Sequence, residues 1–458
     1  MNSAWLDFLG LLAIIALLGA VAVLSIVLRE LAPSAGLTGR RRFLLAAGLG
    51  MGVLAFAAKA MAITIMVTMP QATLTPLSVL RHPERPAHRA ALPRDTTAPP
   101  KSQYVWRALP EAAPAPDGNP TTPAKVALGE RLFHDKSLSL DHSVACASCH
   151  DVVGGTGVDG RATSEGIASQ FGKRNAPTVW NAAFQARLFL DGRAPSLEEQ
   201  AKGPPVNPIE MGMHSLAEVA ARVAAEPDYR AAFALAFGPD RPIDIGAVVA
   251  AIAAYERTLV TPDAPYDRYV RGDKSALDAA QVRGMALFES VGCVVCHHGP
   301  NFSSASRFDA RAPYRLFPAY GNDYVGRYRL ADDLGLAAAS GARGVWKVPS
   351  LRNVALTGPY FHNGSVTRLE EAVRIMATSQ LNRRVVAAPA GTDAVYWLAA
   401  DQALHRAESR DLTEAEVSDI AAFLRALSSE RLAAAIRAGR TAAGVPPTVA
   451  KYAPAAGS

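Results

Sequence analysis

Two copies of one short motif constrain this chain more than any other feature. All four cysteines fall in the segments Cys146–His150 and Cys293–His297, and both segments have the pattern Cys-x-x-Cys-His. Two thiols three residues apart can each bond to one vinyl group of a single haem, and the adjacent imidazole can reach the haem iron. The two motifs therefore predict two covalently bound haem c groups.

Paired cysteines also occur in disulfide redox centres and in zinc sites. A redox Cys-x-x-Cys usually lies at a strand–helix turn of a thioredoxin-like α/β fold, and no such pattern surrounds either motif. A zinc site could use both pairs, but it would not require a histidine directly after each of them. We therefore assign haem to both motifs, with binding residues Cys146, Cys149, His150, Cys293, Cys296 and His297.

The N-terminal segment contains two apolar runs that could anchor the chain in a membrane. Phe8–Leu28 comprises 21 uncharged residues, and about 20 residues suffice to cross the hydrocarbon core as a helix. Phe43–Met69 is interrupted only by Lys59, and an arginine-rich loop separates the two runs. The positive-inside rule puts this loop in the cytoplasm. The sequence thus predicts a hairpin in the bacterial inner membrane, with the rest of the chain in the periplasm.

A cleaved export signal is the other interpretation of the second apolar run. Arg40–Leu44 resembles a twin-arginine signal, and Ala60–Ala62 resembles a cleavage site. We favour the hairpin, because haem c is attached after export of an unfolded chain and because the apolar run continues past that site. Either interpretation delivers the body of the chain to the periplasm.

The formal net charge of +6 comes from the N-terminal part of the chain alone. Residues 1–125 contain 12 Lys and Arg against 6 Asp and Glu, whereas residues 126–458 contain 35 of each. Because the body is balanced, the high pI does not indicate nucleic-acid binding. We expect no nucleic-acid partner.

Helical patterns dominate the rest of the chain. Few segments alternate as strands would, and an amphipathic helix precedes each haem motif. We predict a mostly α fold with two cytochrome c-like haem domains, preceded by an N-terminal transmembrane segment or hairpin. The predicted regions are a membrane anchor (1–69), a Pro- and Ala-rich linker (70–121), a first haem domain (122–274), a second haem domain (275–430) and a C-terminal tail (431–458).

Local patterns predict where several helices begin. Pro123 suits the first turn of one helix, and Pro242 suits the first turn of another over residues 243–260. An amphipathic pattern predicts a further helix over residues 277–289. The Ser/Thr-x-x-Glu pattern of a capping box occurs at Ser196, Thr367 and Thr413.

Several longer segments surround the two motifs in a fixed order. They are Leu128–Phe133, Arg174–Thr178, Leu190–Ala194, Glu199–Ala201, Asn207–Gly212, Lys347–Asn353 and Pro359–Gly364. Together with the Cys-x-x-Cys-His motifs, they resemble the bacterial dihaem cytochrome c peroxidase family, which includes the MauG-type dihaem oxidases. The resemblance covers roughly residues 122–428, which is nearly all of the body.

The resemblance implies different roles for the two haems. The first is peroxidatic in this family, with His150 as proximal ligand, Glu210 as distal carboxylate and Gln200 as its neighbour. A carboxylate in a partly apolar pocket can take a proton from one peroxide oxygen and give it to the other. The second transfers electrons, with His297 as proximal and Met376 as axial ligand. Without the resemblance, we would interpret Glu210 as a surface carboxylate and Met376 as a core residue.

The family also binds one calcium ion between its domains. Asn175 matches the side-chain ligand, and Thr357 and Pro359 match the backbone-carbonyl ligands. Oxygen ligands from both domains suit a hard cation that fixes their relative position. The resemblance therefore implies one calcium ion, and it also implies a homodimer.

The sequence departs from the family pattern at two positions. Many members close the resting peroxidatic haem with a histidine, but Ile167 stands at this position and residues 151–174 contain no histidine. We therefore expect this haem to be five-coordinate or water-ligated at rest. Members usually have tryptophan where this chain has Leu190, and leucine cannot be oxidised to relay an electron. Trp180 and Trp346 are alternatives that the sequence does not place.

The favoured function is that of a cytochrome-c peroxidase, an oxidoreductase that takes hydrogen peroxide as electron acceptor. A small cytochrome c or cupredoxin would supply the electrons, and the membrane anchor leaves room for a membrane donor. One alternative is a MauG-type oxidase that modifies aromatic residues of a partner protein; Met376 argues against it, because MauG has tyrosine there. The other is a non-catalytic electron-transfer cytochrome, against which Glu210 and Gln200 argue.

Overall fold

The structure is a computed structural model, and it describes residues 104–153, 155–310, 312–333, 335–336, 344–386 and 411–437. Within this part of the chain, no helix is long and apolar enough to cross a membrane. The two runs predicted as spans, Phe8–Leu28 and Phe43–Met69, lie outside the described residues. The described part is mostly helical, as the sequence predicts.

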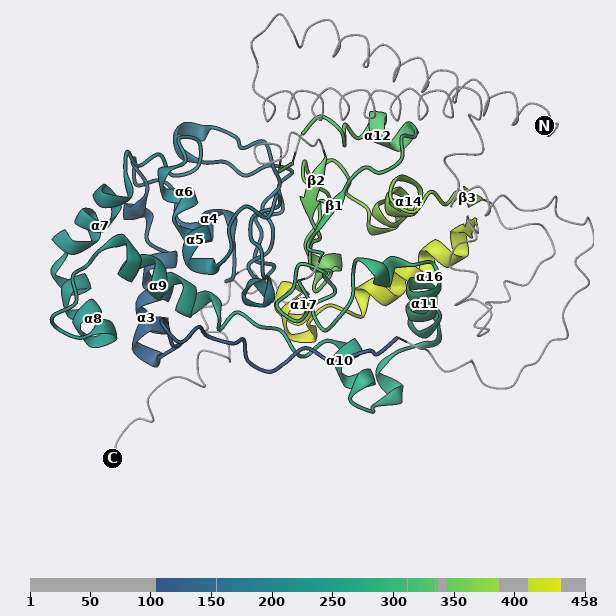
Figure 1. Ribbon diagram of the computed structural model, residues 1–458, viewed down its shortest axis with the longest axis horizontal. Helices are drawn as coiled ribbons and strands as arrows, with labels where there is room; N and C mark the ends of the chain where they lie inside the picture. The colour runs from purple at the N-terminus through teal and green to yellow at the C-terminus, as the bar shows by residue number, and fades with distance from the viewer. Residues whose placement is uncertain are drawn as a thin grey trace, which may run out of the picture. The chain divides into compact units, whose positions relative to one another are not determined.

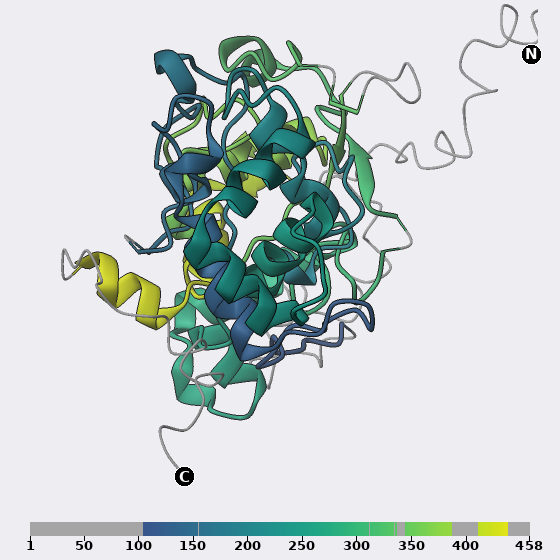
Figure 2. The same cartoon turned by 90° about the vertical axis from the view of Figure 1, so that its left-hand side faces the viewer.

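The first haem domain consists of helices joined by loops. It lies on the left of Figure 1 and faces the viewer in Figure 2. Its α-helices are α3 (Pro123–Phe133), α4 (Cys146–Cys149), α5 (Leu197–Ala201), α6 (Gly203–Val206), α7 (Leu216–Ala225), α8 (Pro227–Phe237) and α9 (Ile245–Glu256). The 3-10 turns η1 (Lys136–Leu138), η2 (Ile167–Ser169) and η3 (Ala182–Phe184) lie between them.

The second haem domain adds short strands to the same plan. Its helices are α10 (Pro265–Val270), α11 (Ala279–Ser290), α12 (Asp323–Arg327), α14 (Leu369–Ser379), α16 (Glu414–Arg425) and α17 (Glu430–Arg437), with η4 (Lys274–Ala276), η5 (Cys293–Val295) and η6 (Val354–Leu356). Strands β1 (Tyr314–Leu316) and β2 (Val345–Lys347) pair antiparallel, with Arg315 opposite Trp346. Strands β3 (Val385–Val386) and β4 (Leu412–Thr413) pair in parallel.

Both domains are built around the same crossing of two helices. In the first, α3 crosses α9 at Gly129, where an added Cβ would lie 1.9 Å from the carbonyl oxygen of Ala251. In the second, α11 crosses α16 at Gly284, where an added Cβ would lie 1.8 Å from the carbonyl oxygen of Asp419. A side chain at either glycine would push the two helices apart. In each domain the helix with this glycine leads toward the haem motif.

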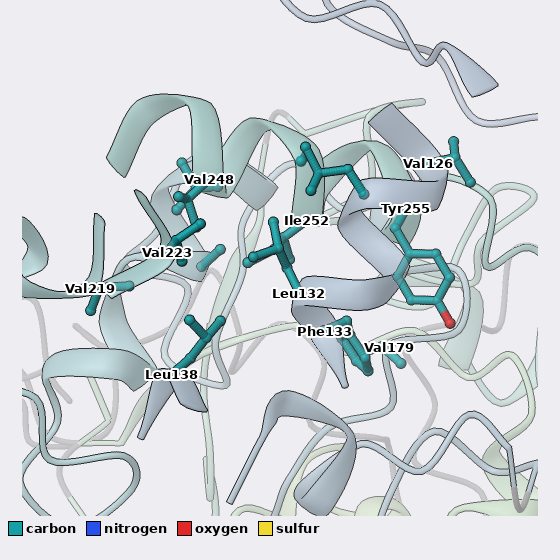
Figure 3. Close-up of a cluster of buried hydrophobic side chains, with 14 of the residues drawn as sticks. Val126, Leu132, Phe133, Leu138, Val179, Val219, Val223, Val248, Ile252 and Tyr255 are labelled. Atoms are coloured by element: carbon teal, nitrogen blue, oxygen red, sulfur yellow. The ribbon is translucent and has the colours of Figure 1, made fainter. Parts of the chain in front are cut away.

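Apolar side chains of the crossing helices form each core. Phe133 of α3 packs beside Ile252 and Tyr255 of α9 (Figure 3). In the second domain Phe288 of α11 packs against Phe423 of α16, with ring centroids 5.4 Å apart. Full burial of one such side chain contributes about 1.5–3 kcal/mol, so both crossings are held mainly by apolar contact.

Several predicted helix starts are confirmed. Helix α3 begins at Pro123, and the amphipathic pattern over residues 277–289 corresponds to α11. The Ser196 hydroxyl caps α5 by accepting from the backbone of Glu199. Thr413 forms the capping box of α16.

Two predicted starts are wrong. Helix α9 begins at Ile245, because the Asp244 carboxylate caps it, and Pro242 lies before the helix. Helix α14 begins after Arg368, which has an extended backbone, so Thr367 lies too far from the first turn to cap it. In both places the local pattern was correct for a helix but not for its first residue.

Residues 104–121, predicted as part of an extended linker, pack on the body. Leu109 is buried, and its backbone N–H donates to the Asp267 carboxylate at 2.8 Å. Trp106 joins the aromatic cluster of the second domain. Asn119 is buried in the first domain. The proline-rich composition of this stretch obscured its apolar side chains.

The two haem domains belong to one compact unit. Helix α17 begins where the second domain was predicted to end, and Leu432 of α17 packs into the core of the first domain. Residues 431–437 are therefore part of the body and not of a tail.

Candidate haem sites and distal pocket

The first haem motif occupies α4 and ends at His150. Ring nitrogen Nδ1 of His150 lies 3.4 Å from the carbonyl oxygen of Gly157, and the backbone of Pro177 also hydrogen-bonds the ring. A bond from Nδ1–H to a carbonyl leaves Nε2 as the nitrogen that binds a metal. Burial lowers the pKa of His150, so the ring is neutral at pH 7, which is the form that binds iron.

The second motif has the same arrangement. Nδ1 of His297 lies 3.1 Å from the carbonyl oxygen of Phe302, and the backbone of Pro349 also hydrogen-bonds the ring. Burial lowers the pKa of His297 to about 4. Both imidazoles are therefore neutral and oriented so that Nε2 is the ligand atom.

The cysteines fit thioether bonds to haem better than thiolate chemistry. None of the four forms a disulfide. Burial raises the pKa of Cys146 and of Cys293 to about 12, whereas redox and zinc cysteines are stabilised as thiolates. Among the described residues, no three His, Cys, Asp or Glu side chains group together as a metal site. The spacing of each thiol pair and the oriented imidazole that follows it fit two covalently bound haems.

Glu210 lies in a half-buried turn beside the first motif. Its charge contributes to the raised pKa values of Cys146 and Cys149, which places the carboxyl near both thiols. Asn207 Nδ2 donates to Glu210 Oε1 at 2.7 Å. Burial raises the pKa of Glu210, and the charge of Arg193 opposes this rise. A carboxyl with a raised pKa can act as both acid and base near neutral pH.

Ile167, which stands at the family's histidine position, is next to Glu210. Its backbone N–H donates to the carbonyl oxygen of Glu210 at 3.0 Å. Its side chain is buried and packs over Gly212, where an added Cβ would lie 2.1 Å from Ile167 Cδ1. Gly166 is equally confined, because an added Cβ would lie 1.9 Å from the carbonyl oxygen of Ile209. The loop is thus fixed beside Glu210 with a hydrocarbon side chain that offers no ligand atom.

Gln200 and Met376 lie on helices close to the two sites. Gln200 is half-buried near the end of α5, and Met376 is half-buried on α14. Met376 packs with Leu190 against an apolar cluster that contains Trp346. The roles of Gln200 in the pocket and of Met376 as an axial ligand stay predictions.

Asn175 meets the segment that contains the other predicted calcium ligands. Its backbone N–H donates to the carbonyl oxygen of His362 at 2.7 Å, three residues after the end of Thr357–Pro359. Its side-chain Nδ2 donates to the carbonyl oxygens of Arg161 and Ala162. The structure thus brings segments of both domains with oxygen donors together, which is the donor type that calcium prefers.

The two tryptophans that the sequence does not place lie in different surroundings. Trp180 is in the core of the first domain, and its Nε1–H donates to the carbonyl oxygen of Gly155 at 2.8 Å. Trp346 is on β2, where the two domains meet, in the cluster against which Leu190 packs.

Charged groups that the sequence analysis missed distinguish the two motifs. Glu256 on α9 is 4% exposed, and burial raises its pKa to about 8. Its charge also contributes to the raised pKa of Cys146. At the second motif, Arg315 Nε lies 3.2 Å from Cys296 Sγ, and the charge of Arg383 acts on the other thiol. No local pattern marks these residues, because tertiary packing brings them to the motifs.

Comparison with known proteins agrees with this arrangement. The family model described as di-haem cytochrome c peroxidase matches residues 123–275. Cytochrome c peroxidase Ccp of Escherichia coli (strain K12) is 40% identical over 274 residues, which cover 59% of this chain and only 57% of that protein. Cytochrome c551 peroxidase of Pseudomonas aeruginosa is 40% identical over 290 residues, which cover 62% of this chain and 81% of the relative.

A solved structure is similar over almost its whole length. It is that of a MauG-like protein associated with microbial copper homeostasis, and it is 33% identical with a TM-score of 0.58. The match covers 72% of this chain and 97% of the other. The similarity thus includes both haem domains.

Proposed function

This chain belongs to the dihaem cytochrome c peroxidase and MauG family, and we propose that it reduces hydrogen peroxide to water. The observation that best supports this proposal is the half-buried carboxyl of Glu210 beside the first haem motif, whose pKa is raised by desolvation. At the second motif, the cations Arg315 and Arg383 act on the thiols. Peroxide cleavage requires a group that accepts and donates protons, whereas electron transfer alone does not.

The residues of the first domain divide the work of peroxide cleavage. Haem bound through Cys146 and Cys149, with its iron on His150, would supply the redox chemistry. In its ionised form, the Glu210 carboxylate takes a proton from one peroxide oxygen. It then gives this proton to the other oxygen, which leaves as water. The bond from Asn207 to Oε1 keeps the carboxyl oriented for both transfers. Two electrons and two protons convert one peroxide into two waters.

We also propose that the first site accepts peroxide at rest, without prior reduction of the enzyme. The support is Ile167, which lies beside Glu210 with a buried hydrocarbon side chain. A hydrocarbon cannot bind iron, so no ligand has to leave from this position before peroxide enters.

The second domain would receive electrons from a small cytochrome c or a cupredoxin. His297 and Met376 would hold the haem bound there, and thioether ligation raises a haem potential. Val295, between the two cysteines of this motif, is 59% exposed. An apolar, accessible edge at the motif supports docking of a small redox partner.

We propose a periplasmic location for the body, attached to the bacterial inner membrane by the N-terminal segment. The support is the charge distribution around the apolar runs and the requirement for haem attachment after export. We further propose one calcium ion at Asn175, Thr357 and Pro359, because segments with oxygen donors meet there. Removing it with a chelator should lower the midpoint of thermal unfolding.

A MauG-type oxidase is the second candidate. The 33% identical structure that this chain covers over 97% of its length is called MauG-like. Such an enzyme would use peroxide to oxidise an aromatic residue of a partner protein. The hydrocarbon at Ile167 suits both candidates, since both need an accessible first site.

Electron counting separates the two candidates. The full-length protein with both haems is mixed with reduced small cytochrome c, and hydrogen peroxide is added in portions without oxygen. A peroxidase oxidises two cytochrome molecules for each peroxide, with turnover far above that of free haem. Peroxide consumption without cytochrome oxidation would contradict the peroxidase proposal and favour the oxidase.

A further inference from the structure

A short segment is repeated in the two haem domains. Arg174–Thr178 and Trp346–Ser350 both have proline at the fourth position, followed by a hydroxyl residue. The backbone of that proline hydrogen-bonds the haem-binding imidazole of its own domain, Pro177 to His150 and Pro349 to His297. The first residue of each segment therefore lies three residues from the proximal side of a haem site.

These two first residues contact each other. The guanidinium carbon of Arg174 lies 4.9 Å from the centroid of the Trp346 ring. Next to it, the backbone N–H of Lys347 donates to the carbonyl oxygen of Leu190 at 3.2 Å. The indole of Trp346 is only 7% exposed, so it is buried where the proximal segments of the two domains meet.

Trp346 is also linked to the second motif across the β1–β2 pair. Its partner in the antiparallel register is Arg315, and Nε of Arg315 lies 3.2 Å from Cys296 Sγ. The indole therefore has a short path to each motif, one through Arg174 and one through its own strand pair.

The surroundings of the indole suit the loss of an electron. Its ring stacks on His362, with centroids 4.3 Å apart and planes at 14°. Arg174 is positive, but it forms ion pairs with Asp191 and Asp333, both at 2.7 Å. The two carboxylates offset the guanidinium charge, which by itself would oppose a positive ring.

Within the described part of the chain, the Nε1–H of the indole has no hydrogen-bond acceptor to which it could pass its proton. Among the described residues, none accepts a hydrogen bond from the buried Nε1–H of Trp346. The proton therefore stays on the ring when an electron leaves, and only an electron moves.

Other aromatic side chains at the junction are less suitable. The hydroxyl of Tyr314 donates to the carbonyl oxygen of Gly192 at 2.9 Å, and a carbonyl does not take the proton that tyrosine oxidation releases. Phe317 and Phe361 stack on each other in the same region, but a phenyl ring is much harder to oxidise than an indole.

We propose that Trp346 is the residue through which electrons pass from the second haem domain to the first. Trp346 would give one electron to the oxidised first site and would regain one electron from the haem held at His297. The net change is one electron moved, with the second haem oxidised, the first site reduced and Trp346 restored. This inference rests on the proposed two-haem peroxidase.

The test measures electron transfer between the haems and not turnover. The full-length protein with both haems is first treated with one equivalent of peroxide, which oxidises the first site. The second haem then receives one electron by flash reduction, and absorbance follows the transfer of that electron to the first site. Trp346→Phe should slow this step at least about tenfold, which corresponds to roughly 1.4 kcal/mol of barrier.

Two matched variants control for structural effects. Tyr314→Phe removes a hydroxyl at the same junction, and Trp180→Phe removes a buried indole from the first domain; both should keep the wild-type rate. Replacement of all tryptophans by a fluorinated analogue, which is harder to oxidise, should slow transfer without changing ring size. The analogue also tests the inference if Trp346→Phe does not load both haems.

The outcomes are distinct. An unchanged rate in Trp346→Phe, or in the fluorinated protein, would overturn the role of Trp346 and leave the peroxidase intact. If the wild-type protein transfers no electron between its haems, the proposed function itself fails.

Discussion

The two haem domains share a scaffold but differ in the charges around their motifs. Gly129 and Gly284 occupy the same place in the helix crossings, and both haem-binding imidazoles are oriented by backbone carbonyls. Carboxyl groups of Glu210 and Glu256 act on Cys146 of the first motif, whereas Asp159 and Arg161 act with opposite signs on Cys149. At the second motif the neighbouring charges are positive.

This difference has a physical consequence for the two irons. Positive charge near a haem favours the ferrous form, and negative charge favours the ferric form. The second haem should therefore have the higher potential, which suits a site that collects electrons. The first has the proton-handling group that peroxide cleavage needs. The two domains thus share one scaffold, and residues outside the helix crossing suit one domain to electron collection and the other to peroxide cleavage.

The helix crossings give a residue-by-residue correspondence. Ala251 on α9 corresponds to Asp419 on α16, because each faces the crossing glycine, and Tyr255 corresponds to Phe423, whose Cβ is also close to that glycine. The residue after each aromatic is then Glu256 in the first domain and Leu424 in the second. This correspondence makes Glu256 a specific departure from the shared scaffold.

The largest expected effect is on peroxide turnover. Glu210→Gln keeps the size of the side chain but removes its ability to exchange a proton, so turnover should fall by about 100- to 10,000-fold. Steady-state oxidation of reduced cytochrome c measures it. Glu226→Gln, which changes an exposed carboxylate of the same domain, should have no effect. If Glu210→Gln and Glu226→Gln have equal peroxide turnover, Glu210 is not the proton-handling group that distinguishes the first domain from the second.

The second prediction tests whether the two crossings are equivalent. Gly129→Ala and Gly284→Ala each place a methyl group against a backbone carbonyl, so each should reduce the free energy of unfolding by about 3 kcal/mol. Denaturant unfolding of the full-length protein with both haems measures this. Gly118→Ala, where an added Cβ meets nothing within 4 Å, is the control. A neutral result at one crossing only would show that the domains are not built alike.

The third prediction concerns the charge of Glu256. Its pKa rises to about 8 in the folded protein, above the value near 4.3 of an unfolded chain. Folding therefore favours the protonated form, and the wild-type protein should lose stability as pH rises from about 4.5 to 8. Glu256→Leu, which introduces the residue of the second domain, should remove this loss.

Unfolding at pH 5 and at pH 8 measures this effect. Between the two pH values, the free energy of unfolding of the wild-type protein should fall by at least about 1.4 kcal/mol more than that of Glu256→Leu. This difference is equivalent to one pKa unit. If the free energies of unfolding of the two proteins change in parallel with pH, a neighbouring group already offsets the charge of Glu256, which would contradict this prediction.

The smallest expected effect is on the second haem's potential. Arg315→Gln removes a positive charge beside Cys296, so this potential should fall by roughly 40 mV, or about 1 kcal/mol for one electron. The first haem should change less. Spectroelectrochemical titration measures both, and a fall of equal size in the two haems would contradict a local charge effect.

The sequence was sufficient for the features that depend on local pattern. Both haem motifs, the mostly helical fold and the caps at Ser196 and Thr413 follow from residue spacing alone. The proximity of Glu210 to the first motif agrees with the family resemblance.

What the sequence did not predict depends on contacts between distant segments. Arg315 and Glu256 reach the motifs through strand pairing and helix crossing, which no short pattern reports. Leu109 and Leu432 pack on the body from regions interpreted as linker and tail, because composition does not show which apolar side chains find a core. Trp346 could be named but not placed for the same reason.

The claim that the first site is open to peroxide can be tested directly by electron paramagnetic resonance. Spectra of the purified diferric protein are recorded before and after one equivalent of peroxide. We predict a high-spin ferric signal from the haem at His150 that disappears on addition, and a low-spin signal from the haem at His297. Two low-spin signals that peroxide does not change would show that a ligand closes the first iron, and would contradict the account.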